Sequence, residues 1–201
     1  MKLLIGSTNT GKVHEYGILL ADADVEVVGL ADVGLGDMDV EENGTTFEEN
    51  AIIKAKAYAQ ASGLAALADD SGICVDALDG RPGLYSARYG GAGLDNAGRR
   101  RKLLGELEAV PDEKRGAEFV CVIAVALPDG DTVHLAEGIC RGSIAQTEST
   151  GISGFGYDPV FIPEGYDRTF ADISDDEKNE LSHRGRAAKK IIATLNQLAA
   201  R

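Results

Sequence analysis

Two consecutive aspartates and a serine follow a short apolar run, and their side chains suit metal or phosphate chemistry. Asp69, Asp70, Ser71 and Gly72 come directly after the apolar residues 64–68. If that run is a buried strand, two carboxylates and a hydroxyl stand at its end, with a glycine to turn the chain. Mg²⁺ prefers oxygen ligands and usually takes only one or two carboxylates from a protein. An Asp-Ser-Gly turn without any chemistry is the alternative that this stretch alone leaves open.

A second string of interest joins the first predicted strand to the first predicted helix. Residues 6–12 read GSTNTGK, and the backbone N–H groups of such a turn can hold an anion at the helix N-terminus. The spacing nearly matches a P-loop, but Val13 stands where that motif needs a hydroxyl to bind Mg²⁺. A P-loop, a different phosphate-binding turn and a plain connection therefore compete. Asn9 and Lys12 favour the phosphate-binding turn, because a plain connection does not need them.

Acidic and basic residues before and within the next predicted helix suit the same chemistry. Glu41 and Glu42 lie in a loop, and acids distant in sequence can converge on one cation. Asn50 and Lys54 are four residues apart, so they share one face of the helix. Solvated loop acids and a surface lysine are the alternatives.

The C-terminal half contains a loop rich in glycine and aromatic residues and a small polar cluster. Residues 151–159 read GISGFGYDP; glycines let a backbone approach a ligand, and a phenylalanine can stack on a base. Lys178, Ser182, His183 and Arg184 gather around the start of the last predicted helix, where a histidine followed by an arginine is suited to bind a phosphate or a carbonyl. A tight turn with a buried aromatic residue, and a helix cap with surface charges, are the alternatives.

The elements that must position these residues alternate between strand and helix early in the chain and form an antiparallel run later. This order favours an α/β protein with a mixed sheet flanked by helices. The length of 201 residues fits one domain or two closely packed lobes. The patterns predict strands at 2–6, 25–30, 64–68, 73–78, 119–127, 132–140 and 141–146, and helices ending near 20 and covering 46–62, 95–108 and 182–198.

The net charge of −13 argues against nucleic acid or an anionic membrane as a partner, because both need a broad basic face. The one basic run, residues 99–102, lies in a helical pattern with leucines on its apolar side. It is therefore expected to form a solvated helix face.

The cysteine content and the apolar runs predict a soluble cytoplasmic protein. Cys74, Cys121 and Cys140 are odd in number and lie in apolar stretches, as packed reduced thiols do. The first residues form too short an apolar run for a signal peptide, and the longest run, 119–127, cannot cross a bilayer.

Five stretches of the chain, in order, resemble the inosine/xanthosine triphosphate pyrophosphatase family, which clears deaminated purine nucleotides. They reach from residue 6 to residue 185, so the resemblance covers nearly the whole chain. The stretches are GSTNTGK at 6–12, EENGTTFEENAIIKA at 41–55, ADDSGICVDALDGRPGLYSARY at 68–89, GFGYDPVF at 154–161 and EKNELSHRG at 177–185.

The resemblance implies a single two-lobed domain over residues 1–201, with a mixed α/β sheet around a deep substrate cleft, and a homodimer. It also implies Mg²⁺-dependent cleavage between the α- and β-phosphates of ITP, dITP and XTP, giving the monophosphate and pyrophosphate. An NTPase of the P-loop kind that releases orthophosphate, and a catalytically silent nucleotide-binding module, are the other functions considered.

Roles for individual residues also follow from the resemblance. Asp70 is expected to act as general base and Mg²⁺ ligand, with Glu41 or Glu42 helping to hold the metal. Lys54 is expected to contact the triphosphate as part of the catalytic group, and Ser71 to contact the substrate. The other residues expected to bind substrate are Ser7, Thr8, Asn9, Thr10, Gly11 and Lys12 for the triphosphate, and Phe155, Gly156, Tyr157, Asp158, Lys178, His183 and Arg184 for the purine.

Overall fold

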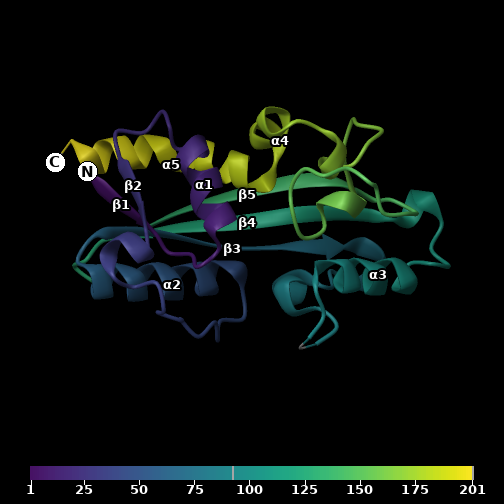
Figure 1. Ribbon diagram of the computed structural model, residues 1–201, viewed down its shortest axis with the longest axis horizontal. Helices are drawn as coiled ribbons and strands as arrows, with labels where there is room; N and C mark the ends of the chain where they lie inside the picture. Colours follow the sequence, from purple (N-terminus) through teal and green to yellow (C-terminus); the bar gives the residue numbers. More distant parts are fainter. Residues whose placement is uncertain (92, 201) are drawn as a thin grey trace. The chain divides into compact units, whose positions relative to one another are not determined.

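The computed structural model describes residues 1–91 and 93–200, and its strands form one six-stranded mixed sheet (Figure 1). The order is β2-β1-β3-β4-β5-β6; β1 pairs in parallel with β2 and β3, whereas β5 and β6 pair antiparallel. The strands are β1 Lys2–Ile5, β2 Glu26–Gly29, β3 Ala65–Val75, β4 Gly116–Ala126, β5 Val133–Ile144 and β6 Phe161–Pro163. The α-helices are α1 Thr10–Leu19, α2 Phe47–Ser62, α3 Asn96–Glu106, α4 Asp175–Leu181 and α5 His183–Ala199. The predicted α/β class with a mixed sheet is confirmed.

The chain divides into two compact units, and β3, β4 and β5 each contribute residues to both. The first unit comprises residues 1–70, 121–138 and 184–201, and the second comprises residues 71–120 and 139–183. The described part of the chain has no helix long and apolar enough to cross a membrane.

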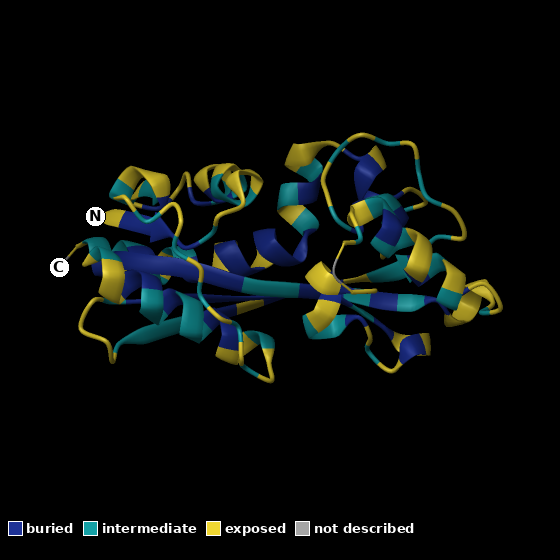
Figure 2. Ribbon diagram, turned by 60° about the horizontal axis from the view of Figure 1, so that its bottom comes forward, coloured by how far each residue is buried: buried dark blue, intermediate teal, exposed yellow. Residues whose placement is uncertain are grey.

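The core of the first unit follows from the two-residue period of its strands. Leu3 and Ile5 pack on one face with residues of α1 and α5, whereas Leu4 packs on the other face with residues of α2. Figure 1 shows α1 and α5 on one side of the sheet and α2 on the other. Buried residues are concentrated along the strands and the inward faces of the helices (Figure 2).

Helix α2 begins and ends where its sequence predicts. The Thr46 side chain accepts a hydrogen bond from the Glu49 backbone N–H at 3.1 Å. This N–H lies in the first turn and has no hydrogen-bond acceptor within the helix. Gly63 ends the helix with a φ of 69°, a left-handed conformation that glycine adopts without strain. The caps fix the register of the helix, and with it the face that carries Asn50 and Lys54.

The core of the second unit is aromatic. The rings of Phe119 and Phe161 meet edge to face with centroids 4.7 Å apart, and Phe170 packs against both. Beside this core, the buried guanidinium of Arg115 donates to the carbonyls of Leu107 and Ile144. It thereby ties the end of α3 to the end of β5.

Two predicted boundaries are wrong. The strands expected at 64–68 and 73–78 are one strand, β3, which runs from Ala65 to Val75, so the aspartates lie within a strand and not at its end. Similarly, β5 continues to Ile144 where a break was expected after residue 140. Asp, Ser and Gly have low strand propensity, but pairing with neighbouring strands overrides such preferences.

Candidate active site

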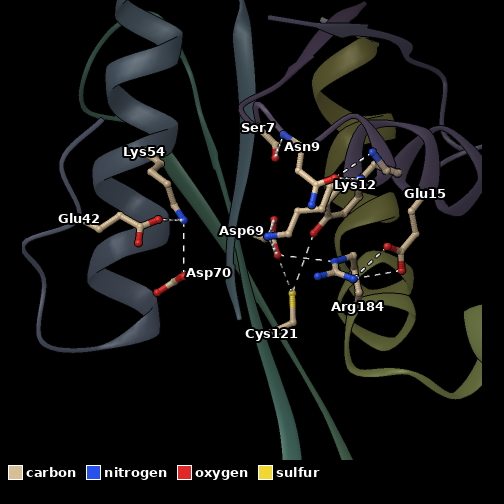
Figure 3. A network of polar contacts seen from close by, with 12 residues as sticks. Ser7, Asn9, Lys12, Glu15, Glu42, Lys54, Asp69, Asp70, Cys121 and Arg184 are labelled. Carbon is tan, nitrogen blue, oxygen red and sulfur yellow. Dashed lines mark hydrogen bonds and ion pairs between the residues drawn. The ribbon is translucent and has the colours of Figure 1, made fainter. Parts of the chain in front are cut away.

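Strand β3 directs Asp69 and Asp70 to opposite faces of the sheet, because successive side chains of a strand alternate. Figure 3 shows Asp70 with Glu42 and Lys54 on the side of α2, and Asp69 with Lys12, Cys121 and Arg184 on the other side. The two neighbouring carboxylates therefore belong to two different polar groups.

Asp70 is held by two residues of α2. The Asn50 side-chain amide donates to Oδ2 of Asp70 at 3.1 Å, and the Lys54 ammonium lies 3.5 Å from Oδ1. Lys54 also donates to the carboxylate of Glu42. Asn50 in turn accepts a hydrogen bond from the Gly44 backbone at 2.8 Å, which ties the acidic loop to the helix.

Burial and the neighbouring charges set the ionisation of this group. Burial raises the pKa of Asp70, and the Lys54 ammonium opposes that rise only in part. Burial disfavours the charge on Lys54, but the carboxylates of Asp70, Asp69 and Glu42 outweigh it and raise the pKa of the ammonium.

The Asp70 side of the strand fits a hard divalent cation. The ammonium of Lys54 already occupies a cation position between the carboxylates of Glu42 and Asp70. These three side chains have one positive and two negative charges, so a divalent ion would leave the group positive and suited to a polyphosphate. The described residues include no cluster of three or more His, Cys, Asp or Glu side chains suited to a metal. Two carboxylates nevertheless match the usual protein share of Mg²⁺ ligands.

On the other face, Asp69 is the buried anion between two cations. Lys12 Nζ lies 3.0 Å from both carboxylate oxygens, and Nε of Arg184 lies 3.6 Å from one of them. Burial opposes the charge of Asp69, but Lys12 and then Arg184 hold its pKa well below the usual range. Arg184 also pairs with Glu15 at 2.9 Å, and despite burial these two acids raise its pKa.

The loop before α1 ends in a side-chain cap of the helix. Oδ1 of Asn9 accepts hydrogen bonds from the backbone N–H groups of Gly11 and Lys12, so Asn9 is the N-cap of α1. A plain strand–helix connection does use such a cap, which corrects the expectation that only a ligand explains Asn9. Thr8 and Thr10 are exposed and Ser7 is half-buried beside them.

In the second unit, Asp158 and Lys178 form a buried ion pair beneath the aromatic loop. Oδ2 of Asp158 accepts from Lys178 Nζ and from the Phe155 backbone N–H, each at 2.7 Å. The ammonium lies 5.4 Å from the centroid of the Phe155 ring, and 40% of Phe155 is exposed. A phenylalanine held in this way can offer a ring face to a flat ligand.

The remaining predicted residues of this unit are more deeply placed. Tyr157 is buried and donates from its hydroxyl to the Ser86 carbonyl at 2.9 Å. The His183 ring stacks on Phe119 with centroids 4.6 Å apart. Ser71 follows Asp70 in β3 and is half-buried.

The structure thus brings several predicted residues together and adds others that were not predicted as site residues. Glu42, Lys54 and Asp70 meet; Glu41 is exposed. Arg184, expected at the purine, forms ion pairs with Glu15 and Asp69. Asn50 and Glu15 were not predicted as site residues. The four-residue spacing of Asn50 and Lys54 was the available signal for Asn50, whereas Glu15 offered none.

Comparison with known proteins places the chain in a family. Residues 3–194 match the Ham1 family, and the chain belongs to it. It is 48% identical to a dITP/XTP pyrophosphatase of Desulforamulus reducens over 198 residues, which is 98% of this chain and 97% of that protein. It is 45% identical to the dITP/XTP pyrophosphatase of Bacillus subtilis, with 96% of each chain covered.

Solved structures agree with the fold. The HAM1 protein of Coxiella burnetii has a TM-score of 0.88 and 39% identity, over 98% of this chain and 99% of that one. A nucleoside-triphosphatase / dITP/XTP pyrophosphatase of Mycobacterium abscessus has a TM-score of 0.76 and 44% identity, over 96% of this chain and 99% of that one.

We expect Asp69→Asn to lower the free energy of unfolding by about 3 kcal/mol, because it leaves Lys12 and Arg184 without their shared buried anion. Urea unfolding followed by circular dichroism measures the change. Asp22→Asn, on an exposed residue of the same unit, is the control and should change stability by no more than about 0.5 kcal/mol.

The effect of pH has a definite sign. The lowered pKa of Asp69 adds stability above the pKa of an unfolded aspartate, so the gap between wild type and variant should persist at neutral pH. The gap should shrink only below about pH 4. Equal stabilities of Asp69→Asn and Asp22→Asn at pH 7 would contradict the ion-pair assignment.

Proposed function

We propose that this protein hydrolyses deaminated purine nucleoside triphosphates, ITP, dITP and XTP, between the α- and β-phosphates. The products are the nucleoside monophosphate and pyrophosphate. The observation that carries the proposal is the half-buried Asp70 carboxylate, held by Asn50 and sharing the Lys54 ammonium with Glu42. Support also comes from membership of the Ham1 family and from the relatives named dITP/XTP pyrophosphatase.

In the proposed mechanism Asp70 accepts a proton from water as the water attacks phosphorus. The P–O bond between the α- and β-phosphates breaks, and one phosphate group keeps the new hydroxyl. A raised pKa makes Asp70 a stronger base than an ordinary aspartate, and Asn50 fixes the direction of its carboxylate. Phosphoryl transfer depends mostly on positioning and charge neutralisation, which Lys12 and Lys54 supply.

Mg²⁺ is the proposed cofactor. Asp70 and Glu42 would hold it, with Glu42 preferred to Glu41 because Glu42 is the one that shares Lys54 with Asp70. When bound, the ion would neutralise charge on the phosphates and leave fewer negative groups facing the attacking water.

Residues of the second unit are proposed to select the base. Phe155 would stack on the purine, and His183 is a candidate donor to its 6-keto group. A site built around that keto group rejects adenine because buried donors are then left unpaired. Ser71, Gly156, Tyr157, Asp158, Lys178 and Arg184 stay predicted substrate residues. The homodimer and the cytoplasmic location also stay predictions, which rest on the resemblance and on the cysteine content.

The reaction itself is tested by identifying the products. We expect wild-type protein with ITP and Mg²⁺ to release pyrophosphate and IMP, and to turn over ATP and GTP far more slowly. Anion-exchange chromatography separates the products. Orthophosphate as first product would indicate an NTPase of the P-loop kind, and no product would indicate a silent nucleotide-binding module.

Asp70→Asn should reduce kcat by about 10²–10⁴-fold, because an amide of nearly the same shape cannot accept the proton. The loss of a metal ligand adds to this effect. Circular dichroism should show an intact fold, since Asn can still accept from Asn50. Substantial residual activity would mean that another group is the base.

Phosphate and base contacts are separable by their effects on selectivity. Lys12→Ala and Lys54→Ala should lower kcat/KM for ITP and ATP alike, because phosphates carry no information about the base. His183→Ala should instead lower the ratio of kcat/KM for ITP to kcat/KM for ATP, because His183 is proposed to contact the purine. An unchanged ratio in His183→Ala, or a changed one in either lysine variant, would contradict the assignment of these contacts.

A further inference from the structure

The basic run at residues 99–102 does not form a uniformly solvated helix face. Arg101 is exposed, as expected for such a face, but only 13% of the Arg100 side chain is exposed. The expectation of a solvated basic face is therefore wrong for Arg100. This side chain leaves α3 and reaches the loop that carries Phe155.

The Arg100 guanidinium bridges two points of that loop. Nε donates to the Glu148 carboxylate at 2.8 Å, and Nη2 donates to the same carboxylate. Nη1 donates to the carbonyl of Gly156 at 2.7 Å. One planar group thus joins the start of the loop to the residue that follows Phe155.

The position of these contacts matters because glycines flank Phe155. Gly154 and Gly156 have φ values of 75° and 63°, a region where only glycine is free of strain, and glycine restrains the backbone least. The Phe155 N–H is held by Asp158, and the carbonyl of Gly156 is held by Arg100. The segment that carries the ring is therefore fixed from both sides by charged groups.

We propose that Arg100 is a positioning residue for base recognition, one that holds the loop so that the Phe155 ring meets the purine. This rests on the proposed function, in which Phe155 stacks on the base. Arginine suits the task because its rigid fork of donors binds a carboxylate and a carbonyl together, which the single ammonium of lysine does less well.

The first test observes the loop without substrate. Limited digestion with chymotrypsin, followed by mass spectrometry, measures the rate of cleavage between Phe155 and Gly156. We expect this cleavage to be faster in Arg100→Ala than in wild type, because the released glycine segment can enter the protease. Arg101→Ala removes the same charge from an exposed neighbour on the same helix and should cleave like wild type.

The second test uses kinetics. Arg100→Ala should raise KM for ITP about 5–10-fold, because the released loop must then be ordered when ITP binds, and should leave kcat nearly unchanged. The inhibition constant of inorganic tripolyphosphate should not change, because that ligand has no base. Arg100→Lys should lie between Arg100→Ala and wild type. A merely structural defect would instead lower kcat and weaken tripolyphosphate as well.

Glu148→Gln keeps the size of the side chain and tests the same bridge from its other end. It should raise KM for ITP less than Arg100→Ala does, and it carries the test if Arg100→Ala fails to fold. The proposal would be overturned if Arg100→Ala and Glu148→Gln had the same cleavage rate and the same KM for ITP as Arg101→Ala. It would also be overturned if they were cleaved faster than wild type but had an unchanged KM. If wild type releases no pyrophosphate from ITP, the proposed function fails. If wild type is active and Arg100→Ala behaves like wild type, only the role of Arg100 is refuted.

Discussion

Alternation along one strand decides how the first unit divides its charges. Because Asp69 and Asp70 are consecutive in β3, they cannot share a face, so each acquires its own partners. Asp69 lies between Lys12 and Arg184, and its pKa is depressed. Asp70 shares one ammonium with Glu42, and burial raises its pKa. Two consecutive residues thus differ in their ionisation: the lowered pKa of Asp69 favours its charged form, whereas the raised pKa of Asp70 makes its carboxylate a stronger base.

Residues of the helices on each face of the sheet give Asp69 and Asp70 different charged neighbours. On the Asp69 face, the two cations Lys12 and Arg184 equal the two acids Asp69 and Glu15 in number. On the Asp70 face, one lysine faces two carboxylates, and the imbalance favours an added cation. Since the chain as a whole carries −13, a polyphosphate needs local positive charge, which a bound divalent ion would provide.

Residue types and local signals made much of this predictable. The caps of α2, the alternation of helices and strands and the helix face shared by Asn50 and Lys54 were readable in the sequence. The continuity of β3 was not, because Asp-Ser-Gly favours a turn and only pairing with other strands overrides that preference. Nor could helical periodicity distinguish Arg100 from Arg101, since their difference depends on a loop nearly fifty residues later in the chain.

The loop around Phe155 combines glycines with two charged groups that hold its backbone. Glycines allow a backbone to approach a ligand closely, but they add conformational entropy that must be lost when the ligand binds. Anchoring the loop in advance through Asp158 and Arg100 removes part of that loss before binding. Under the proposed function, selectivity for a base therefore depends on charged groups that need not touch the base.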